Sequence, residues 1–342
     1  MTRIQKTVPL LLAGLLFLGA TQADAAGRDR IGTSAAPELL IPVGARGMAL
    51  GGASIATTSG VDALHWNPAG LFRSANRVDL MVSTMDYIAG VQVNYLAVGS
   101  HFSGLGNLAV SLKSLDIGDI PITTEGQPDG TGGSFRPTFF TVGVHYGRGL
   151  TDRIGLGTTL HYITNRVDRA QATGLSFSAG LQYLDLADIP GLDLGVTVKH
   201  IGQRMRFEGP GLLNRGDLGT LRRGPSFYNV EASSADLPST FELGLAWNRP
   251  LPGMGELNLS SVFQHHNYSY DQYKVGVEYE YSEFLALRGG FDYAADAEDD
   301  TYLFGNSFGL GLAFGPGVRL DYAYGGVDRF DALHTFTFQL GF

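Results

Sequence analysis

The sequence has no cysteine and, beyond its first 25 residues, no long hydrophobic run. Without cysteine, the chain can have neither a lipid-modified N-terminal cysteine nor a disulfide framework. No later segment reaches even about 15 uninterrupted apolar residues, fewer than the roughly 20 that a membrane-spanning helix needs. Charged residues make up only 17% of the chain, and the net charge of −9 argues against nucleic acid as a partner. If the chain enters a membrane, a closed β-barrel is the remaining way.

The first 25 residues have the layout of a cleavable export signal. Arg3 and Lys6 come first, an apolar run over residues 8–20 follows, and small residues end the stretch at Ala25. The apolar run is too short for an anchor helix and suits a signal peptide with a small-residue cleavage site. We expect residues 1–25 to be removed and the mature protein to begin near Ala26.

The most frequent pattern in the chain is the alternation of apolar residues with other residues. From Asn76 onward, apolar residues recur at every second position, in segments separated by turn residues. A period of two indicates β-strands. Fourteen such segments can be counted, and an even number is typical of a single-chain bacterial barrel with both ends in the periplasm. We therefore predict an all-β fold, a transmembrane antiparallel β-barrel of about 14 strands over residues 76–342.

The predicted connections differ between the two ends of the barrel. They are mostly short after even-numbered strands and longest after odd-numbered ones, at residues 116–137, 203–238 and 294–305. Short periplasmic turns and long external loops are typical of outer-membrane barrels. The expected location is therefore a Gram-negative outer membrane. A soluble sandwich or propeller is the alternative, but fourteen alternating strands without a blade repeat do not suit it. On the predicted strands, the positions between the apolar residues form a second face, and its charged and histidine side chains are predicted to line a water-filled lumen: Lys113, His145, His161, Lys199, Glu242, Lys274, Glu278, Glu280, Arg288, Asp292, Arg319 and Asp321.

The last strand ends on an aromatic residue, with apolar residues at every second position before it. This pattern resembles the terminal signal that the outer-membrane barrel assembly machinery reads, which makes that machinery a candidate partner. The candidate insertion signal is Phe336, Phe338, Leu340 and Phe342.

Residues 26–75 do not alternate, and we predict a compact hatch or plug inside the barrel. Glycines here let the backbone lie close against a wall, because no side chain holds it off. Asp62 can cap one helical turn, and Pro68 then pushes Asn67 into extended geometry. A fourteen-stranded barrel has an interior wider than its own side chains fill. A dinucleotide-binding turn is an alternative interpretation of the glycines, but it requires a βαβ unit, whereas a barrel pattern follows.

Two motifs in this segment carry a family resemblance: GARGMALGGA at residues 44–53 and ALHWNPAGL at 63–71. With the barrel pattern, they resemble the PorV/PorQ family of outer-membrane proteins, which is related to the long-chain fatty acid transporter (FadL) family. The resemblance implies an N-terminal hatch folded into the barrel, with an Asn-Pro-Ala hatch turn. The candidate hatch residues are Gly44, Ala45, Arg46, Gly51, Gly52, Trp66, Asn67, Pro68, Ala69 and Gly70.

The resemblance implies two functions of different classes. PorV-type proteins act as partners in type IX secretion, so secreted cargo and secretion-complex proteins are candidate partners. FadL-type proteins admit hydrophobic small molecules such as fatty acids or hydrocarbons. The charged lumen favours the secretion role, although any water-filled barrel has one. An apolar pocket would favour uptake, whereas simple plug packing of the same residues would not: Leu39, Leu40, Ile41, Met48, Leu50 and Trp66.

The loop over residues 203–238 is rich in arginine. Arginine can grip lipopolysaccharide phosphates or a partner's carboxylates through paired hydrogen bonds. Acidic residues in the loop nearly balance these charges, so a solvated loop is the alternative. The candidate external contacts are Arg204, Arg206, Arg222 and Arg223.

No metal, cofactor or catalytic site is predicted. The acidic stretch Asp296, Glu298, Asp299 and Asp300 offers oxygen ligands for Ca²⁺, but without EF-hand or repeat spacing. The adjacent His265 and His266 point to opposite faces of a strand and cannot readily chelate one ion together. No nucleophile or paired-carboxylate motif stands out, so we expect no enzymatic activity. An outer-membrane protease or lipase is the unsupported alternative.

Overall fold

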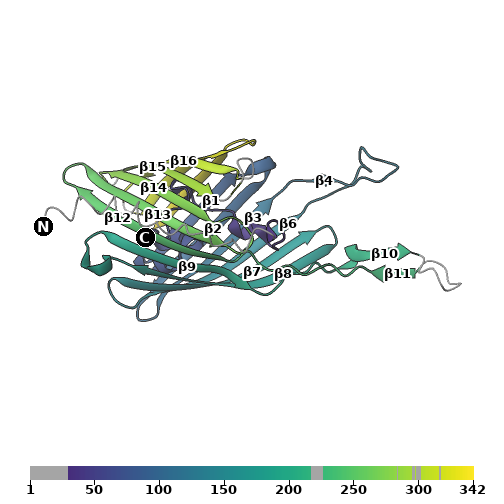
Figure 1. Cartoon of the computed structure of the whole chain (residues 1–342), viewed down its shortest axis with the longest axis horizontal. Helices are drawn as coiled ribbons and strands as arrows, with labels where there is room; N and C mark the ends of the chain where they lie inside the picture. The colour runs from purple at the N-terminus through teal and green to yellow at the C-terminus, as the bar shows by residue number, and fades with distance from the viewer. Residues whose placement is uncertain (1–29, 217–225, 283, 295–296, 298–301, 316) are drawn as a thin grey trace.

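The structure is a computed structural model, and it describes residues 30–216, 226–282, 284–294, 297, 302–315 and 317–342. Within these residues, fourteen antiparallel strands close into one barrel (Figure 1), which confirms the predicted fold class and strand number. In chain order they are β1 Val78–Asp86, β2 Gln92–Phe102, β3 Gly106–Asp116, β6 Thr138–Gly149, β7 Ile154–Val167, β8 Ala170–Tyr183, β9 Leu192–Gly202, β12 Thr240–Leu251, β13 Gly255–His266, β14 Gln272–Tyr281, β15 Leu285–Ala294, β16 Phe304–Ala313, β17 Val318–Val327 and β18 Leu333–Gly341.

The first and last strands close the barrel. β1 pairs with β18, with Val82 opposite Phe338, and Val78 and Phe342 exchange two backbone hydrogen bonds of 2.9 and 3.0 Å. Every barrel strand therefore has a neighbour on both sides, which removes the free sheet edge that a bilayer does not tolerate.

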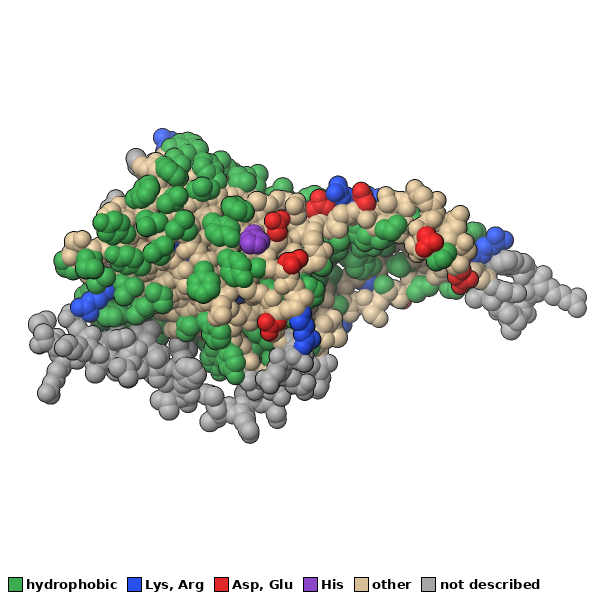
Figure 2. All heavy atoms as spheres, turned by 90° about the horizontal axis from the view of Figure 1, so that it is seen from above, with side chains coloured by type: hydrophobic (Ala, Val, Ile, Leu, Met, Phe, Trp, Pro, Cys, Tyr) green, Lys and Arg blue, Asp and Glu red, His purple; other side chains and the backbone are tan. Residues whose placement is uncertain are grey.

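The alternation in the sequence separates the two faces of the wall. Along β18 buried and exposed residues alternate, and Phe336, Phe338 and Phe342 lie on the outside. Figure 2 shows this face of the barrel covered largely by hydrophobic side chains, with the acidic side chains gathered toward the right of the view. The charged residues predicted for the lumen are all buried or half-buried, because they lie on the opposite face.

The two ends of the barrel differ in their connections. At the end that contains the C-terminus, here the turn end, the connections are short, apart from the 3₁₀ helix η6 Leu186–Asp188. At the opposite end, here the loop end, two arms project beyond the wall (Figure 1). One arm contains β4 Ile120–Pro121 and β5 Ser134–Phe135, and the other contains η7 Pro210–Leu212, β10 Leu213–Gly216 and β11 Ser226–Asn229. These two hairpins were not predicted from the sequence. The loop end also carries η5 Ile88–Gly90.

The described part of the N-terminal segment, residues 30–75, consists of short helices joined by turns. They are η2 Pro37–Leu40, α2 Ala45–Ala49, η3 Gly60–Asp62, α3 Ala63–Trp66 and η4 Pro68–Arg73. α2 packs against β15, β16, β17 and β18, whereas η4 packs against β3, β6, β7 and β8. The two contact regions lie on different arcs of the inner wall. None of the described helices is long and apolar enough to cross a bilayer.

Asp62 does not act as the predicted side-chain cap of α3. It has helical backbone geometry itself, because η3 runs directly into α3, and its side chain makes no capping hydrogen bond. The predicted end of the turn is observed: Asn67 is extended, with φ −152° and ψ 104°.

Candidate functional site

The Asn67-Pro68 turn is held by the Asn67 side chain, which is 0% exposed. Its Nδ2 donates hydrogen bonds to the carbonyl oxygens of Ile55, at 2.8 Å, and Leu181 of β8, at 3.1 Å. Its Oδ1 accepts a hydrogen bond from the backbone N–H of Ala69, at 3.1 Å, which caps η4. One amide therefore ties the N-terminal segment to itself and to the barrel wall.

Glycines of the wall give this turn its place. A Cβ on Gly180 of β8 would collide with Oδ1 of Asn67, and a Cβ on Gly157 of β7 would collide with the backbone at Pro68. Both glycines lie on the inner face, where a side chain would otherwise fill the lumen. The close approach that we predicted from glycines in the N-terminal segment thus depends also on glycines in the strands.

Trp66 joins the two helical turns of the segment. Its indole N–H donates to the carbonyl oxygen of Val43 at 3.1 Å, and the ring lies where a Cβ on Gly47 of α2 would be. Nζ of Lys199 lies 5.9 Å from the ring centroid, within the range of a cation–π contact.

On a different arc of the wall, Arg46 enters a buried ionic cluster. Its Nε and NH2 groups donate to Oε1 and Oε2 of Glu278, at 3.0 and 2.6 Å, in the paired geometry that suits a guanidinium and a carboxylate. Arg288 also donates to Glu278, at 2.6 Å, and to Asp321, at 2.7 Å. Arg319 donates to Asp321 at 3.1 Å. The barrel strands supply every member of this cluster except Arg46.

The remaining motif residues fix the backbone of the segment. Gly44, Gly51 and Gly52 have positive φ angles of 85°, 62° and 81°, which favour glycine. The N–H of Ala45 donates to Oγ1 of Thr337 in β18, at 2.8 Å. Gly70 packs closely against Thr58.

A cavity of about 460 Å³ lies between the N-terminal segment and the loop end. Its apolar side includes Leu39, Leu40, Ile41, Met48 and Trp66, five of the six residues considered for an apolar pocket. The sixth, Leu50, is fully buried and does not line the cavity. Plug packing alone therefore does not describe these side chains.

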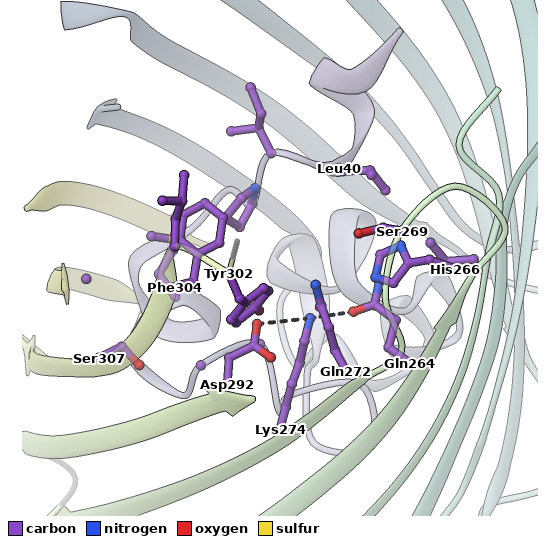
Figure 3. A pocket seen from close by; sticks show the side chains of 18 of the residues that line it. Leu40, Gln264, His266, Ser269, Gln272, Lys274, Asp292, Tyr302, Phe304 and Ser307 are labelled. Carbon is purple, nitrogen blue, oxygen red and sulfur yellow. Dashed lines mark hydrogen bonds and ion pairs between the residues drawn. The ribbon is translucent and has the colours of Figure 1, made fainter. Parts of the chain in front are cut away.

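The other side of the cavity is polar, and Figure 3 shows its side chains converging from β13, β14 and β15. Lys274 donates a hydrogen bond to Gln264 and lies 3.9 Å from the carboxylate of Asp292. Lys199 pairs with Glu242 at 2.9 Å. All of these residues lie in the loop-end halves of their strands, so the cavity occupies that half of the lumen.

At the loop end, Asp236 connects the start of the N-terminal segment to the base of the second arm. It accepts hydrogen bonds from Arg30 at 2.9 Å and Tyr268 at 2.6 Å, and pairs with Arg204 at 2.9 Å. The hydrogen bond from Tyr268, helped by the two guanidinium groups, lowers the pKa of Asp236. The Ala35 N–H donates to the backbone carbonyl of Asp236 at 2.8 Å, which adds a second link.

Of the arginines predicted as external contacts, those that the structure describes form ion pairs with acidic residues of the same loop. Arg204 pairs with Asp236, and Arg206 pairs with Glu208 and Glu231. The pairs with Asp236 and Glu231 join the two legs of the arm, which also exchange backbone hydrogen bonds between Met205 and Ala235. Arg222 and Arg223 lie outside the described residues.

The other predicted features are distributed over the molecule. His265 pairs with Asp271, whereas His266 faces the lumen, so the two rings are on opposite faces as expected. Asp296 and the acidic residues 298–300 lie outside the described residues. Among the described residues, no group of three or more histidine, aspartate and glutamate side chains is placed to hold a metal ion.

Gly180, Gly157 and Gln182 were not singled out from the sequence. Gln182 donates to the carbonyl oxygens of Ile55 and Thr58, at 3.0 and 2.9 Å. The available signal was a glycine at an inward position of two adjacent strands, which leaves a gap in the row of lumen side chains.

Residues 24–191 match the family model described as "Type IX secretion system protein PorV". Among curated protein sequences, none matches the chain significantly. The matched residues include both N-terminal motifs and the strands up to β8, so the resemblance stated from the sequence is confirmed.

Solved structures of outer-membrane channels share the fold. The CymD monoaromatic hydrocarbon channel has a TM-score of 0.58 at 13% identity, over 89% of this chain and 98% of its own. The Ralstonia pickettii toluene transporter TbuX has a TM-score of 0.55 at 14% identity, over 87% and 98%. A Pseudomonas aeruginosa FadL homologue has a TM-score of 0.50 at 12% identity, over 88% and 99%. At such low identities the likeness establishes the fold only.

Proposed function

We propose that this chain, a PorV-like outer-membrane β-barrel with a FadL-like fold, serves as a non-enzymatic partner in type IX-like secretion. In this role it presents or holds exported cargo at the cell surface. The observation that carries this proposal is the second arm at the loop end, which bears an apolar surface beyond the barrel wall. In an outer-membrane barrel, long connections lie on the external side.

Four hydrophobic residues are exposed on the second arm, with Leu213 and Phe227 on one face of its hairpin and Tyr228 and Val230 on the other. Phe227 is 74% exposed, although it belongs to a strand. β10 and β11 form a sheet of only two strands among the described residues, so both have edges available for pairing with another chain. Exposed apolar residues next to free strand edges are typical of a protein interaction site.

The test replaces Leu213, Phe227 and Tyr228 together with serine and compares the proteins that copurify from native membranes. We expect the variant to lose secreted proteins while it keeps its amount and its heat-modifiable migration on a gel. The control replaces Ile120 and Ile122, which are exposed on the first arm, with serine. Unchanged copurification of secreted proteins with the second-arm variant would contradict the proposal.

The cavity favours a second function, the uptake of hydrophobic small molecules. Its volume of about 460 Å³ falls within the range of small-molecule sites. Bound small molecules identified by mass spectrometry, together with the absence of copurified secreted proteins, would support uptake over the secretion role.

For the N-terminal segment, we propose the role of a hatch, with the motif residues at 44–52 and 66–70 as its anchors. The contacts of Asn67 with β8 and of Arg46 with β14, on different arcs of the wall, support this role. We further propose that Phe336, Phe338, Leu340 and Phe342 serve as the insertion signal for the barrel assembly machinery. Lipopolysaccharide is a proposed partner at the loop end.

A further inference from the structure

The two sides of the cavity have opposite chemistry. On the side of the N-terminal segment, β1 and β16, aromatic rings of Trp66, Tyr87 and Phe304 join aliphatic side chains. On the side of β12 to β15, the lining is made of charged, amide and imidazole groups (Figure 3). An occupant that suits both sides has an apolar body and one polar group.

The charges on the polar side cancel. Lys199 pairs with Glu242 at 2.9 Å, and Lys274 stands 3.9 Å from Asp292, so each ammonium has its own carboxylate. An anionic ligand would bring a third negative charge beside Asp292 and Glu242, and like charges close together inside a protein repel. A cationic ligand would meet the two lysines in the same way.

Three polar groups of the lining lack a hydrogen bond of good geometry to any described residue. Nε2 of His266 is one of them, although its imidazole interacts with the Gln272 side chain, and the residue is only 5% exposed. Oδ1 of Asp292 and the hydroxyl of Tyr302 are the other two, although the two side chains interact with each other, and Figure 3 places the Tyr302 ring beside Asp292. Leaving such groups without a hydrogen bond in a ligand complex is unfavourable. A pure hydrocarbon in this cavity would exclude water from these groups and could not form hydrogen bonds with them.

We propose that the cavity binds a neutral aromatic compound with a hydroxyl group, that is, a phenol or an aromatic alcohol. A hydroxyl both donates and accepts, so it can donate to Asp292 while it accepts from Lys274 or His266. The ring packs against the aromatic and aliphatic side, where offset and edge-on ring contacts are favourable. The proposal rests on the uptake function and names its substrate class; the secretion role does not depend on it.

The first experiment measures binding to the full-length protein in lipid nanodiscs with three matched probes: 4-ethylphenol, ethylbenzene and 4-ethylbenzoate. The quenching of Trp66 fluorescence, in a Trp247→Phe background, reports on the cavity. We expect 4-ethylphenol to bind about tenfold or more tightly than either other probe, because losing a hydrogen bond to a buried charged group lowers the affinity by about that factor or more. Equal or tighter binding of ethylbenzene, tighter binding of 4-ethylbenzoate, or no binding of any probe would overturn the proposal.

The second experiment changes the charge balance. Asp292→Asn leaves Lys274 without its carboxylate, so affinity for 4-ethylphenol is expected to fall and affinity for 4-ethylbenzoate to rise. Asp271→Asn is the matched control, because Asp271 pairs with His265 and does not line the cavity. An unchanged ranking of the probes in Asp292→Asn would contradict the role given to this carboxylate. If the variant does not assemble, the ranking in the first experiment still decides.

These binding measurements are separable from the uptake function. Tight binding of 4-ethylphenol without its passage into proteoliposomes would reject uptake while it retains the ligand class. Passage of ethylbenzene in preference to 4-ethylphenol would support uptake and reject the ligand class.

Discussion

The N-terminal segment is attached to two arcs of the barrel wall by different physical means. On β7 and β8, the Asn67-Pro68 turn fits over glycines and is held by neutral hydrogen bonds to backbone carbonyls. On β14, the attachment is the ion pair between Arg46 and Glu278. The first depends on shape, and any added atom disturbs it. The second joins two charges of a cluster that keeps its other members when one leaves. We therefore expect the neutral attachment to position the segment and the ionic one to be easier to release.

The largest effect is expected from a side chain that fills the space occupied by the Asn67-Pro68 turn, because it displaces the neutral attachment from the wall. Gly180→Val places side-chain atoms where Oδ1 of Asn67 lies, so the whole turn must leave the wall. We expect a loss at or above the upper end of the about 1–3 kcal/mol typical of overpacking. Small-solute leakage into proteoliposomes and protease cleavage within residues 30–75 should both increase, with heat-modifiable migration retained. Gly289→Ala is the control, because a Cβ there meets only Phe308 at 3.9 Å. Normal leakage in Gly180→Val would contradict the positioning role.

The next effect comes from removing the amide itself. Asn67→Ala leaves the carbonyl of Leu181 and the N–H of Ala69 without their side-chain partner, whereas the carbonyl of Ile55 keeps Gln182. The orphaned N–H of Ala69 costs about 1–3 kcal/mol, whereas Leu181 stays paired within the sheet. We expect the combined Asn67→Ala, Pro68→Ala variant to leak small solutes with an intact barrel, because the strands close their own hydrogen bonds. Loss of barrel assembly would show instead that the turn is needed for folding.

The ionic attachment should be weaker. Arg46→Ala removes a paired contact worth about 1.5–3 kcal/mol, but Glu278 keeps Arg288. We expect leakage to increase less than in Gly180→Val. Arg46→Lys, which keeps the charge but loses the paired geometry, should lie between the wild type and Arg46→Ala. Leakage from Arg46→Ala above that from Gly180→Val would reverse the comparison.

The smallest effect is expected at the loop end, where pH acts on Asp236. Its pKa is lowered in the folded protein, so its bonds to Arg30 and Tyr268 stabilise the start of the segment above the ordinary carboxylate pKa of about 3.9. That contribution is lost as the pH falls through the lowered pKa. Amide exchange at Ala35, relative to an Asp236→Asn reference, should quicken in acid by about two- to fivefold, as for an exposed ion pair. A constant ratio between the two proteins would contradict this linkage.

The barrel could be predicted from the sequence, but much of the candidate site could not. Alternation places Phe338 outside and Lys274 inside with no knowledge of their neighbours, because strand geometry fixes the side of each residue. Extended geometry at Asn67 was equally local, since Pro68 imposes it. The partners of Asn67 could not be predicted, because Gly180 and Leu181 lie more than a hundred residues away in the sequence. Their contact with Asn67 depends on how the barrel curves.

Other parts of the site depend on competition between contacts. Asp62 was expected to cap α3 but continues the helical turn before it. Arg204 and Arg206 were chosen for their charge, and the structure uses them to join the two legs of the arm. The two-stranded hairpins were hidden because a short pair of strands in a long loop has no repeated pattern to detect.

The path of the chain has a consequence for the order of assembly. Residue 30 lies at the loop end, the segment passes through the lumen, and β1 then begins at the turn end. The ring is completed only when β18, the final strand, meets β1. The first described part of the chain is thus enclosed by strands that a ribosome makes after it. When the seam between β1 and β18 joins, the segment is enclosed together with any fault in its placement.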